Sequence, residues 1–256
     1  MSKTKFLLNS TITFSLLFFC NFIVAQQVKY TSGNNSWNPD SLGNHRAVVQ
    51  FTGKGTVAQA VIEWRRRDDH PDQKRIIVQD AKTGKKILNV KTIDINRETG
   101  TILFEPVSGI GTYYVYYMPY KDEGPKTYYP KGVYYTPENT ADAKWAETAT
   151  SNAPVNCTVK EIQSINAFNS FYPMEVIATA AETKALIDKN QGQAFLIFPE
   201  SRTYSIRMKN DLPQRWMLKT DHHSFSDQAM RGEWLAFQLG VYALQDLQDV
   251  SITFSD

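Results

Sequence analysis

Cysteine is scarce in this chain, which has two among its 256 residues. Cys20 lies within the first 25 residues, and Cys157 stands alone in the remainder. Because a single thiol cannot form an intramolecular disulfide, a disulfide-stapled scaffold is excluded for the part after residue 25. The fold must instead depend on a hydrophobic core, and a chain of this length can bury one large core or two smaller ones.

An excess of charge of one sign is also missing. The chain has 28 basic and 26 acidic residues, which gives a net charge of +2. A nucleic-acid-binding domain needs basic residues concentrated on one face, and no such concentration is present, so no nucleic-acid partner is expected. No stretch after residue 25 is long and apolar enough to cross a bilayer, so no membrane span is expected in the mature chain.

Residues 1–25 have the three-part pattern of a secretory signal peptide. Lys3 and Lys5 give a positive start, an apolar stretch runs up to Val24, and Ala25 is a small residue at the expected cleavage point. Polar residues interrupt the apolar stretch, which argues against a membrane span. We therefore expect a mature chain that begins after Ala25 and is secreted or periplasmic.

Residues 28–120 are predicted to form an antiparallel β-sandwich. Aromatic and β-branched residues, which favour strands, are plentiful, and no helix-length pattern interrupts the region. Gly53 and Gly55 separate the first two apolar segments and suit a tight reversal. Short strands at this spacing are typical of a sandwich. The expected strands are Ala47–Phe51, Val57–Trp64, Arg75–Gln79, Lys86–Val90, Thr101–Phe104 and Thr112–Met118.

Residues 121–154 are predicted to be a connector rich in proline and tyrosine, because proline cannot donate to a strand ladder. An alanine-rich piece at 141–149 is a candidate helix within it. Residues 155–256 are predicted to form a second β-rich unit. Its helix is expected at Glu175–Asp188, where apolar residues recur at a spacing of three to four. Its strands are expected at Ala194–Phe198, Ser205–Met208, Glu233–Leu244 and Ser251–Asp256.

The expected fold class is therefore mostly β, with an antiparallel β-sandwich domain followed by a second β-sandwich unit that contains a helix. The sequence stops on a strand pattern with no following partner. A native chain rarely ends in this way, so we expect the second unit to be truncated.

The densest polar run follows the second expected strand. Trp64, Arg65, Arg67 and Asp68 belong to it and form the first candidate carbohydrate-binding set. An indole stacks on the face of a sugar ring, while arginine and aspartate hydrogen-bond sugar hydroxyls. The alternative is a strand end at which Trp64 enters the core and the charges pair in water, and charge runs are more often solvated faces of this kind.

A second candidate surface is aromatic. Tyr114 and Tyr116 share one face of the expected strand at 112–118, because alternate residues of a strand point to opposite sides. With Trp37 they are candidate sugar-binding residues, and the alternative is that they pack against the connector.

Other polar groups carry less weight. Asp122-Glu123 is an adjacent acidic pair but falls in an expected solvated loop, where nothing raises a carboxyl pKa as acid catalysis requires. His222-His223 has no third ligand at a useful spacing, so no metal site is expected. No Gly-x-Ser-x-Gly elbow occurs, so a hydrolase triad has no support. We expect no catalytic residues and no cofactor.

Seven stretches, which together run from about Trp37 to the end of the chain, resemble the N-terminal region of glycoside hydrolase family 123. Each match is loose, and their order along the chain is the informative feature. They are Asn35–Arg46, Trp64–Asp68, Phe104–Gly109, Gly111–Tyr117, Asn169–Ala178, Asp211–Trp216 and Arg231–Gln238.

The resemblance implies a relation to retaining β-N-acetylgalactosaminidases, in which the acetamido oxygen of the substrate attacks the anomeric carbon. It implies an adjacent Asp-Glu pair on a catalytic barrel that follows the sandwich. A barrel needs alternating strands and helices over roughly 250 residues, and no such pattern is present in this chain.

Two functions follow as expectations. In the first, the chain is the non-catalytic N-terminal β-sandwich region of a carbohydrate-active enzyme, and its partner is a downstream catalytic domain. In the second, it is a free-standing carbohydrate-binding or surface-interaction protein, and its partner is a glycan.

Overall fold

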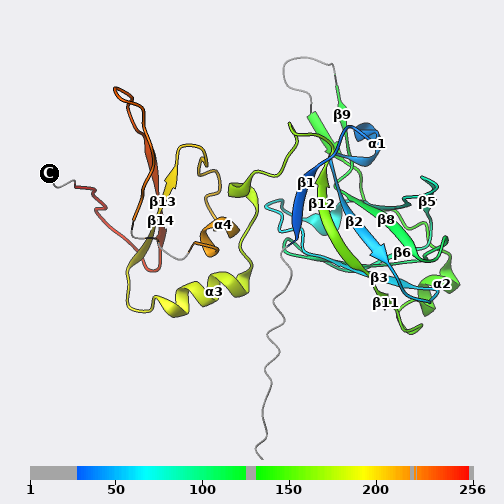
Figure 1. The fold of residues 1–256 in the computed structure, drawn as a ribbon. Helices are drawn as coiled ribbons and strands as arrows, with labels where there is room; N and C mark the ends of the chain where they lie inside the picture. The colour runs from blue at the N-terminus through cyan, green and yellow to red at the C-terminus, as the bar shows by residue number, and fades with distance from the viewer. Residues whose placement is uncertain (1–27, 125–130, 220–221, 223, 254–256) are drawn as a thin grey trace, which may run out of the picture.

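The computed structural model describes residues 28–124, 131–219, 222 and 224–253. The expected signal peptide at 1–25 lies outside the described residues. Figure 1 shows a larger, strand-rich part that carries the first half of the chain and a smaller part that carries helix α3 and strands β13 and β14. The mostly β fold class is confirmed.

The larger part contains a six-stranded sheet with the order β1-β12-β2-β8-β4-β5. Its pairs are antiparallel except for β1 and β12, which run parallel. The strands are β1 (Lys29–Ser32), β12 (Thr158–Ser164), β2 (His45–Phe51), β8 (Gly111–Tyr117), β4 (Ile76–Asp80) and β5 (Lys86–Ile87).

A four-stranded sheet with the order β11-β3-β7-β6 packs on the first. Only the β11–β3 pair is parallel. The strands are β11 (Val155–Asn156), β3 (Ala58–Ile62), β7 (Gly100–Phe104) and β6 (Val90–Ile95).

The core lies between these two sheets. In β8 the alternating residues Tyr113, Val115 and Tyr117 are at most 1% exposed and join the same cluster as Ile62 and Phe104 of the other sheet. Tyr114 lies on the opposite face of β8, in a different cluster. The predicted two-residue alternation of this strand is therefore confirmed, and the packing of two sheets makes this part a β-sandwich.

One predicted turn has a different role from the expected one. Gly53 and Gly55 follow β2, but β2 and β3 belong to different sheets, so the reversal carries the chain across the core and does not close a hairpin. By contrast, β4 and β5 do pair as a hairpin, with Val78 opposite Ile87. Gly84 in that turn has φ +68°, a backbone angle that favours glycine.

The expected connector contains regular structure. Strands β9 (Tyr120–Glu123) and β10 (Lys131–Tyr134) pair antiparallel, and α2 (Ala143–Thr148) occupies the alanine-rich piece in which a helix was expected. Two short elements lie earlier in the chain, α1 (Pro39–Leu42) and the 3-10 turn η1 (Pro71–Gln73).

Strands β11 and β12 come after the expected boundary at residue 154, yet both extend the sheets of the sandwich. We therefore propose that the first domain runs to about residue 165.

The smaller part contains η2 (Pro173–Glu175), α3 (Ala180–Lys189), β13 (Phe195–Ser201), α4 (Gln214–Met217) and β14 (Phe237–Ala243). Strands β13 and β14 form a two-stranded antiparallel sheet. One face of this sheet packs on α4, where Phe198 stacks on Trp216 with ring centroids 4.4 Å apart. Residues 205–208 and 251–253 were expected to be strands but are not in one.

Helix α3 begins five residues later than predicted. Thr179 caps it by accepting a hydrogen bond from the backbone of Glu182, whose side chain accepts one from the backbone of Thr179 in return. The preceding residues Val176 and Ile177 make isolated β-bridges to Arg66 and Pro213. The apolar stripe predicted for the start of the helix is therefore buried as extended chain. No helix in the described ranges is long and apolar enough to span a membrane.

Candidate functional site

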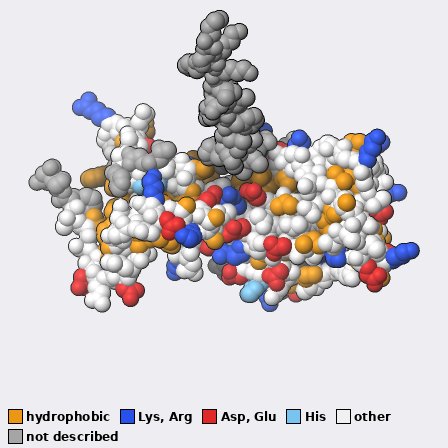
Figure 2. Space-filling view, turned by 90° about the horizontal axis from the view of Figure 1, so that it is seen from below, with side chains coloured by type: hydrophobic (Ala, Val, Ile, Leu, Met, Phe, Trp, Pro, Cys, Tyr) orange, Lys and Arg blue, Asp and Glu red, His pale blue; other side chains and the backbone are white. Residues whose placement is uncertain are grey.

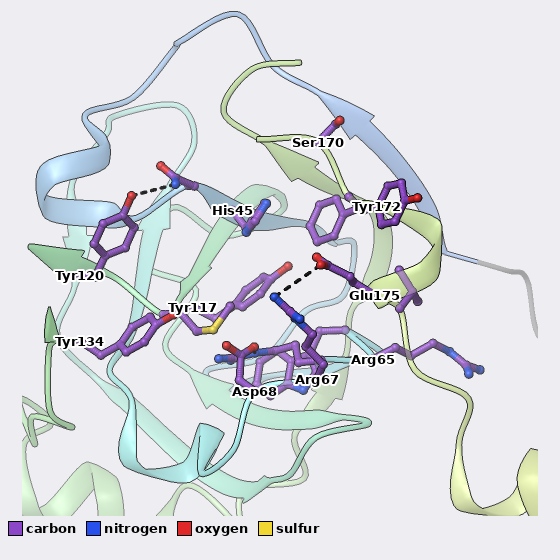
Figure 3. Close-up of a pocket in the computed structure, with 16 residues that line it drawn as sticks. His45, Arg65, Arg67, Asp68, Tyr117, Tyr120, Tyr134, Ser170, Tyr172 and Glu175 are labelled. Carbon is purple, nitrogen blue, oxygen red and sulfur yellow. Dashed lines mark hydrogen bonds and ion pairs between the residues drawn. The ribbon is translucent and has the colours of Figure 1, made fainter. Parts of the chain in front are cut away.

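A cavity of about 250 Å³ opens where the sandwich meets the segment that leads into the smaller part. Figure 3 shows Tyr120 and Tyr134 on one side of it, Tyr172 and Glu175 on the other, and His45 and Tyr117 between them. We call it the junction pocket. Strands β2, β8, β9 and β10 contribute to it, together with the polar run after β3 and the segment around η2.

The inner wall of the junction pocket is aromatic and buried. Tyr117 is 1% exposed, and its ring lies 5.2 Å from that of Trp64. His45 stacks on Tyr117 at 6.4 Å, and its Nε2 lies 2.8 Å from the carbonyl of Asn169. Burial lowers the pKa of His45, so the imidazole is neutral at pH 7.

Arg66 lies in this wall, and few hydrogen-bond acceptors compensate for the burial of its charge. The residue is 5% exposed, and its guanidinium carbon lies 5.4 Å from the ring centroids of both Trp64 and Tyr117. Its Nε donates to Asp68 Oδ2 at 3.2 Å. Nη1 and Nη2 have no hydrogen-bond partner within the part of the chain that the structure describes. Burial lowers the pKa of Arg66, although the carboxylate of Asp68 opposes this effect.

The rim is charged and more exposed. Arg67 Nη2 lies 3.4 Å from Glu175 Oε1, the contact drawn in Figure 3. Arg207 Nη1 approaches the same oxygen at 3.3 Å. Lys74 Nζ lies 3.7 Å from Asp68 Oδ1 and 4.4 Å from the ring centroid of Tyr134. Each of the two carboxylates is thus shared by two cationic side chains.

Arg65, unlike Arg66 and Arg67, forms an ion pair with helix α3. Its Nη1 and Nη2 donate to the two carboxylate oxygens of Glu182 in α3, at 2.7 and 3.1 Å. Burial opposes the charge of both groups, but their hydrogen bonds favour it. For Arg65, the pair with Glu182 outweighs burial and raises the pKa. For Glu182, the hydrogen bonds from Arg65 and Thr179 outweigh burial and lower the pKa. Arg65 therefore ties the smaller part to the sandwich.

The candidate residues predicted from the sequence separate into two groups. Trp64, Arg65, Arg67 and Asp68 line the junction pocket. Trp64 is 1% exposed and its Nε1 donates to the carbonyl of Asn96 at 2.8 Å, so its ring packs in the core and is not free to stack on a sugar. The alternative in which Trp64 enters the core describes this side chain.

Trp37, Tyr114 and Tyr116 lie in a separate cluster on the other face of the six-stranded sheet. The guanidinium of Arg46 lies over the rings of Trp37 and Tyr114, at 4.1 and 3.6 Å from their centroids. Arg46 Nη1 also donates to the hydroxyl of Tyr116 at 3.1 Å. Because Trp37 and Tyr116 are 9% and 1% exposed, they offer no open ring face for a sugar.

Sequence reasoning missed most of the pocket, because only four of its sixteen lining residues were candidates. Tyr117 belongs to the strand face opposite Tyr114 and Tyr116 and was not a candidate, Tyr134 was expected in the connector, and Glu175 was expected to start a helix. Of these, only Tyr134 had a usable signal, an aromatic residue in a polar segment that carries no core pattern. The approach of Glu175 to Arg67 depends on a chain path that no local pattern reveals.

Buried acids elsewhere serve the structure. Glu200 accepts hydrogen bonds from Arg215, Lys219 and Trp216, at 3.2, 3.0 and 3.2 Å. Burial raises the pKa of Glu200, but the hydrogen bonds from Lys219, the backbone N–H of Ser201 and Arg215 outweigh burial, and the net pKa is lowered. A general acid needs the opposite shift.

Asp122 and Glu123 lie in β9 and not in the expected loop, and both are exposed. A hydrogen bond from Lys121 lowers the pKa of Glu123. His222 packs edge-on against Phe198, with centroids 4.9 Å apart, and Asp221 and His223 lie outside the described residues. Within the described ranges, no group of three or more His, Cys, Asp and Glu side chains could hold a metal ion.

Comparison with known families gives one match. The model of the glycoside hydrolase 123 N-terminal domain matches residues 35–165, about half of the chain. The match begins just before α1 and ends just after β12, so it covers the sandwich almost completely. No curated protein and no solved structure matches the chain. The chain therefore belongs to glycoside hydrolase family 123, and residues 35–165 are its N-terminal domain.

Proposed function

We propose that this chain is a non-catalytic accessory region of a secreted family 123 enzyme and that its smaller part packs against a catalytic domain. The family match supports a role in a glycoside hydrolase. The lowered pKa values of the half-buried Glu182 and the buried Glu200 support a structural use of these acids, because acid catalysis needs a raised carboxyl pKa.

The observation that carries the proposal is the outer face of the β13–β14 sheet. In the antiparallel register, Ile197 lies opposite Val241 and Phe195 opposite Ala243, so these side chains share one face. Phe195, Ile197 and Val241 are 40–48% exposed. A two-stranded sheet with an open apolar face is marginal by itself in water, so this face needs a cover.

In Figure 2, acidic and basic side chains mix over the middle, where the two parts meet, and hydrophobic side chains appear over both the smaller part on the left and the larger part on the right. The charged junction is occupied by the Arg65–Glu182 pair and the Arg97–Asp211 pair, in which Arg97 Nη2 lies 2.6 Å from Asp211 Oδ2. Neither pair occupies the apolar sheet face, which we therefore assign to contact with another domain.

A direct assay tests the non-catalytic role. The purified chain is incubated with a chromogenic N-acetyl-β-galactosaminide at several pH values. We expect no turnover above a buffer control. Turnover that persists after a second purification step would overturn the non-catalytic assignment.

A second measurement tests the apolar face. Ile197→Lys places a charge on the face, and Val107→Lys places the same charge on an apolar side chain of the sandwich that is 59% exposed. We expect Ile197→Lys to lower the binding of a hydrophobic dye and self-association at high concentration, while Val107→Lys leaves both nearly unchanged. Equal effects of the two substitutions would remove the docking role of the sheet.

Export through a signal peptide at residues 1–25 is part of the same proposal. Expression of the full sequence in a bacterial host, followed by N-terminal sequencing of the exported protein, should show a new terminus at Gln26. Retention in the cytoplasm with Met1 intact would exclude this leader.

The alternative function, a free-standing carbohydrate-binding protein, is favoured only by the junction pocket. Trp64→Ala is a poor test of it, because Trp64 is part of the core and its loss would disturb folding. Substitutions at Tyr117 and Arg67 test it better.

A further inference from the structure

The junction pocket contains hydrogen-bond donors that the protein leaves unused. Arg66 Nη1, Arg66 Nη2 and the Tyr117 hydroxyl have no hydrogen-bond partner among the described residues. Arg66 is 5% exposed and Tyr117 is 1% exposed, so water at the surface does not replace the missing partners. Buried donors without partners are rare and costly, and an absent ligand is one physical reason for them.

The charges around the pocket favour an anion. Arg66 and Lys74 share the single carboxylate of Asp68, at 3.2 and 3.7 Å. Arg67 and Arg207 share that of Glu175, at 3.4 and 3.3 Å. At both points the cations outnumber the anions.

His45 adds no charge to this balance, because burial lowers its pKa and keeps the imidazole neutral. The pocket therefore has a positive balance beside donors that lack acceptors. An anion placed there would supply the acceptors and the missing negative charge together.

The walls fit a sugar ring. Tyr120 and Tyr134 line one side of the cavity and Tyr172 lines the other, and Phe171 also lines the cavity. The cavity of about 250 Å³ has room for one sugar residue. Tyrosine faces stack on the apolar face of a pyranose, while the charged rim meets its polar groups.

We propose that the junction pocket binds one sugar residue that carries a carboxylate or a sulfate, with the acidic group directed at Arg66, Arg67 and the hydroxyl of Tyr117. The proposal does not depend on whether the chain is catalytic, because none of these three groups is assigned a role in bond cleavage. Since the free donors have almost no exposed surface, nearby side chains must shift as the acidic group enters. Arg67 and Tyr134 are exposed enough to do so.

Calorimetric titration of the full chain tests the proposal with defined sugars. Galacturonic acid and galactose form a matched pair that differs only at carbon 6, and N-acetylgalactosamine 6-sulfate and N-acetylgalactosamine form a second pair. We expect the acidic member of at least one pair to bind about tenfold more tightly than the neutral member, as a charge-assisted hydrogen bond provides. The pair that shows the difference identifies the acidic group.

Two variants separate ligand recognition from folding. Tyr117→Phe removes only a hydroxyl that lacks a partner, so it should leave thermal stability unchanged and weaken the acidic sugar several-fold. Arg67→Ala removes a half-exposed cation and should weaken it about tenfold. Arg202→Ala removes a similarly exposed, ion-paired arginine outside the pocket and serves as the matched control.

Three results would overturn the proposal. They are equal binding of acidic and neutral sugars, no binding of any of the four, and wild-type affinity in both Tyr117→Phe and Arg67→Ala. Sodium sulfate and sodium acetate are titrated alongside. If either free anion binds as tightly as the sugar acid, the sugar part of the proposal fails.

Discussion

Gly100 in β7 lies against Trp64, and an added methyl group at this position should be strongly destabilising. A Cβ atom built on Gly100 would lie 2.1 Å from Trp64 Cη2 and 2.6 Å from Cζ2. Real Cβ contacts do not approach this closely, so the indole would have to move. It is 1% exposed and held by its hydrogen bond to the carbonyl of Asn96, so it can move only by losing core packing and this hydrogen bond.

The expected loss of stability for Gly100→Ala follows from these contacts. Overpacking of a core costs about 1–3 kcal/mol. Displacement of the indole also breaks the hydrogen bond from Trp64 to Asn96, which costs about 1 kcal/mol more. We expect a total near 3 kcal/mol, or a fall in melting temperature of roughly 10 °C for a domain of this size.

Gly111→Ala is the matched control. Gly111 begins β8 in the same sandwich, and an added Cβ would meet nothing within 4 Å. At such a site alanine is neutral or slightly stabilising, by up to about 1 kcal/mol, because it restricts the unfolded chain. The two variants therefore share their chemistry and differ only in the space around the new methyl group.

Urea denaturation followed by circular dichroism measures both variants. In the background of Trp64→Leu, which removes the clashing ring, Gly100→Ala should cost much less than in the wild type. If Gly100→Ala and Gly111→Ala have equal stability, or if Trp64→Leu does not relieve the loss, the reasoning is refuted.

Three further predictions concern titratable groups whose pKa is shifted by their surroundings. Burial lowers the pKa of His45, so as the pH falls the unfolded chain takes up a proton on this residue before the folded chain does. The free energy of unfolding should therefore fall between pH 7 and pH 5, by at most about 1.4 kcal/mol per pH unit. Urea titrations at each pH would measure this slope, which should flatten in His45→Phe. Partial burial raises the pKa of Cys157 to about 12, so at pH 8 this thiol should react with a thiol-specific reagent much more slowly in the native chain than after denaturation. Equal labelling rates of the native and the denatured chain would contradict this prediction. Glu200→Gln should lower the free energy of unfolding by about 1–3 kcal/mol at pH 7, because it leaves Lys219 and Arg215 without their carboxylate. Since the folded pKa of Glu200 is lowered, this difference from wild type should shrink as pH falls below about 4. A difference independent of pH would show that charge is not the cause.

Much of the sandwich is readable from local patterns. The alternation in β8 predicts which tyrosines share a face but not which face is buried, and the segments that carry β2, β3, β4 and β7 are each predicted within a few residues. These features depend on residues two to four positions apart, so the sequence contains the information directly. The same holds for the helical character of α3, although its start is set by the Thr179 cap and by bridges to distant residues.

The partners of these strands are not readable in the same way. Strand β12 inserts between β1 and β2, and Glu161 lies opposite both Lys29 and Val48, more than a hundred residues earlier. A local pattern shows that a strand has a buried face but not which strand will cover its edge. That choice is settled by burial over the whole sandwich, and it moves the proposed end of the first domain from 120 to about 165.

The junction pocket shows the same division. The composition and order of residues determined an exported-type leader pattern, a mostly β fold, a family and the polar run at Trp64–Asp68. Only the tertiary structure turned Trp64 into the core, separated Trp37, Tyr114 and Tyr116 onto the opposite face, and brought Tyr117, Tyr134 and Glu175 to Arg67. The physical reason is that the periodicity of a segment indicates which of its side chains face the interior, whereas a binding site depends on which distant segments come together.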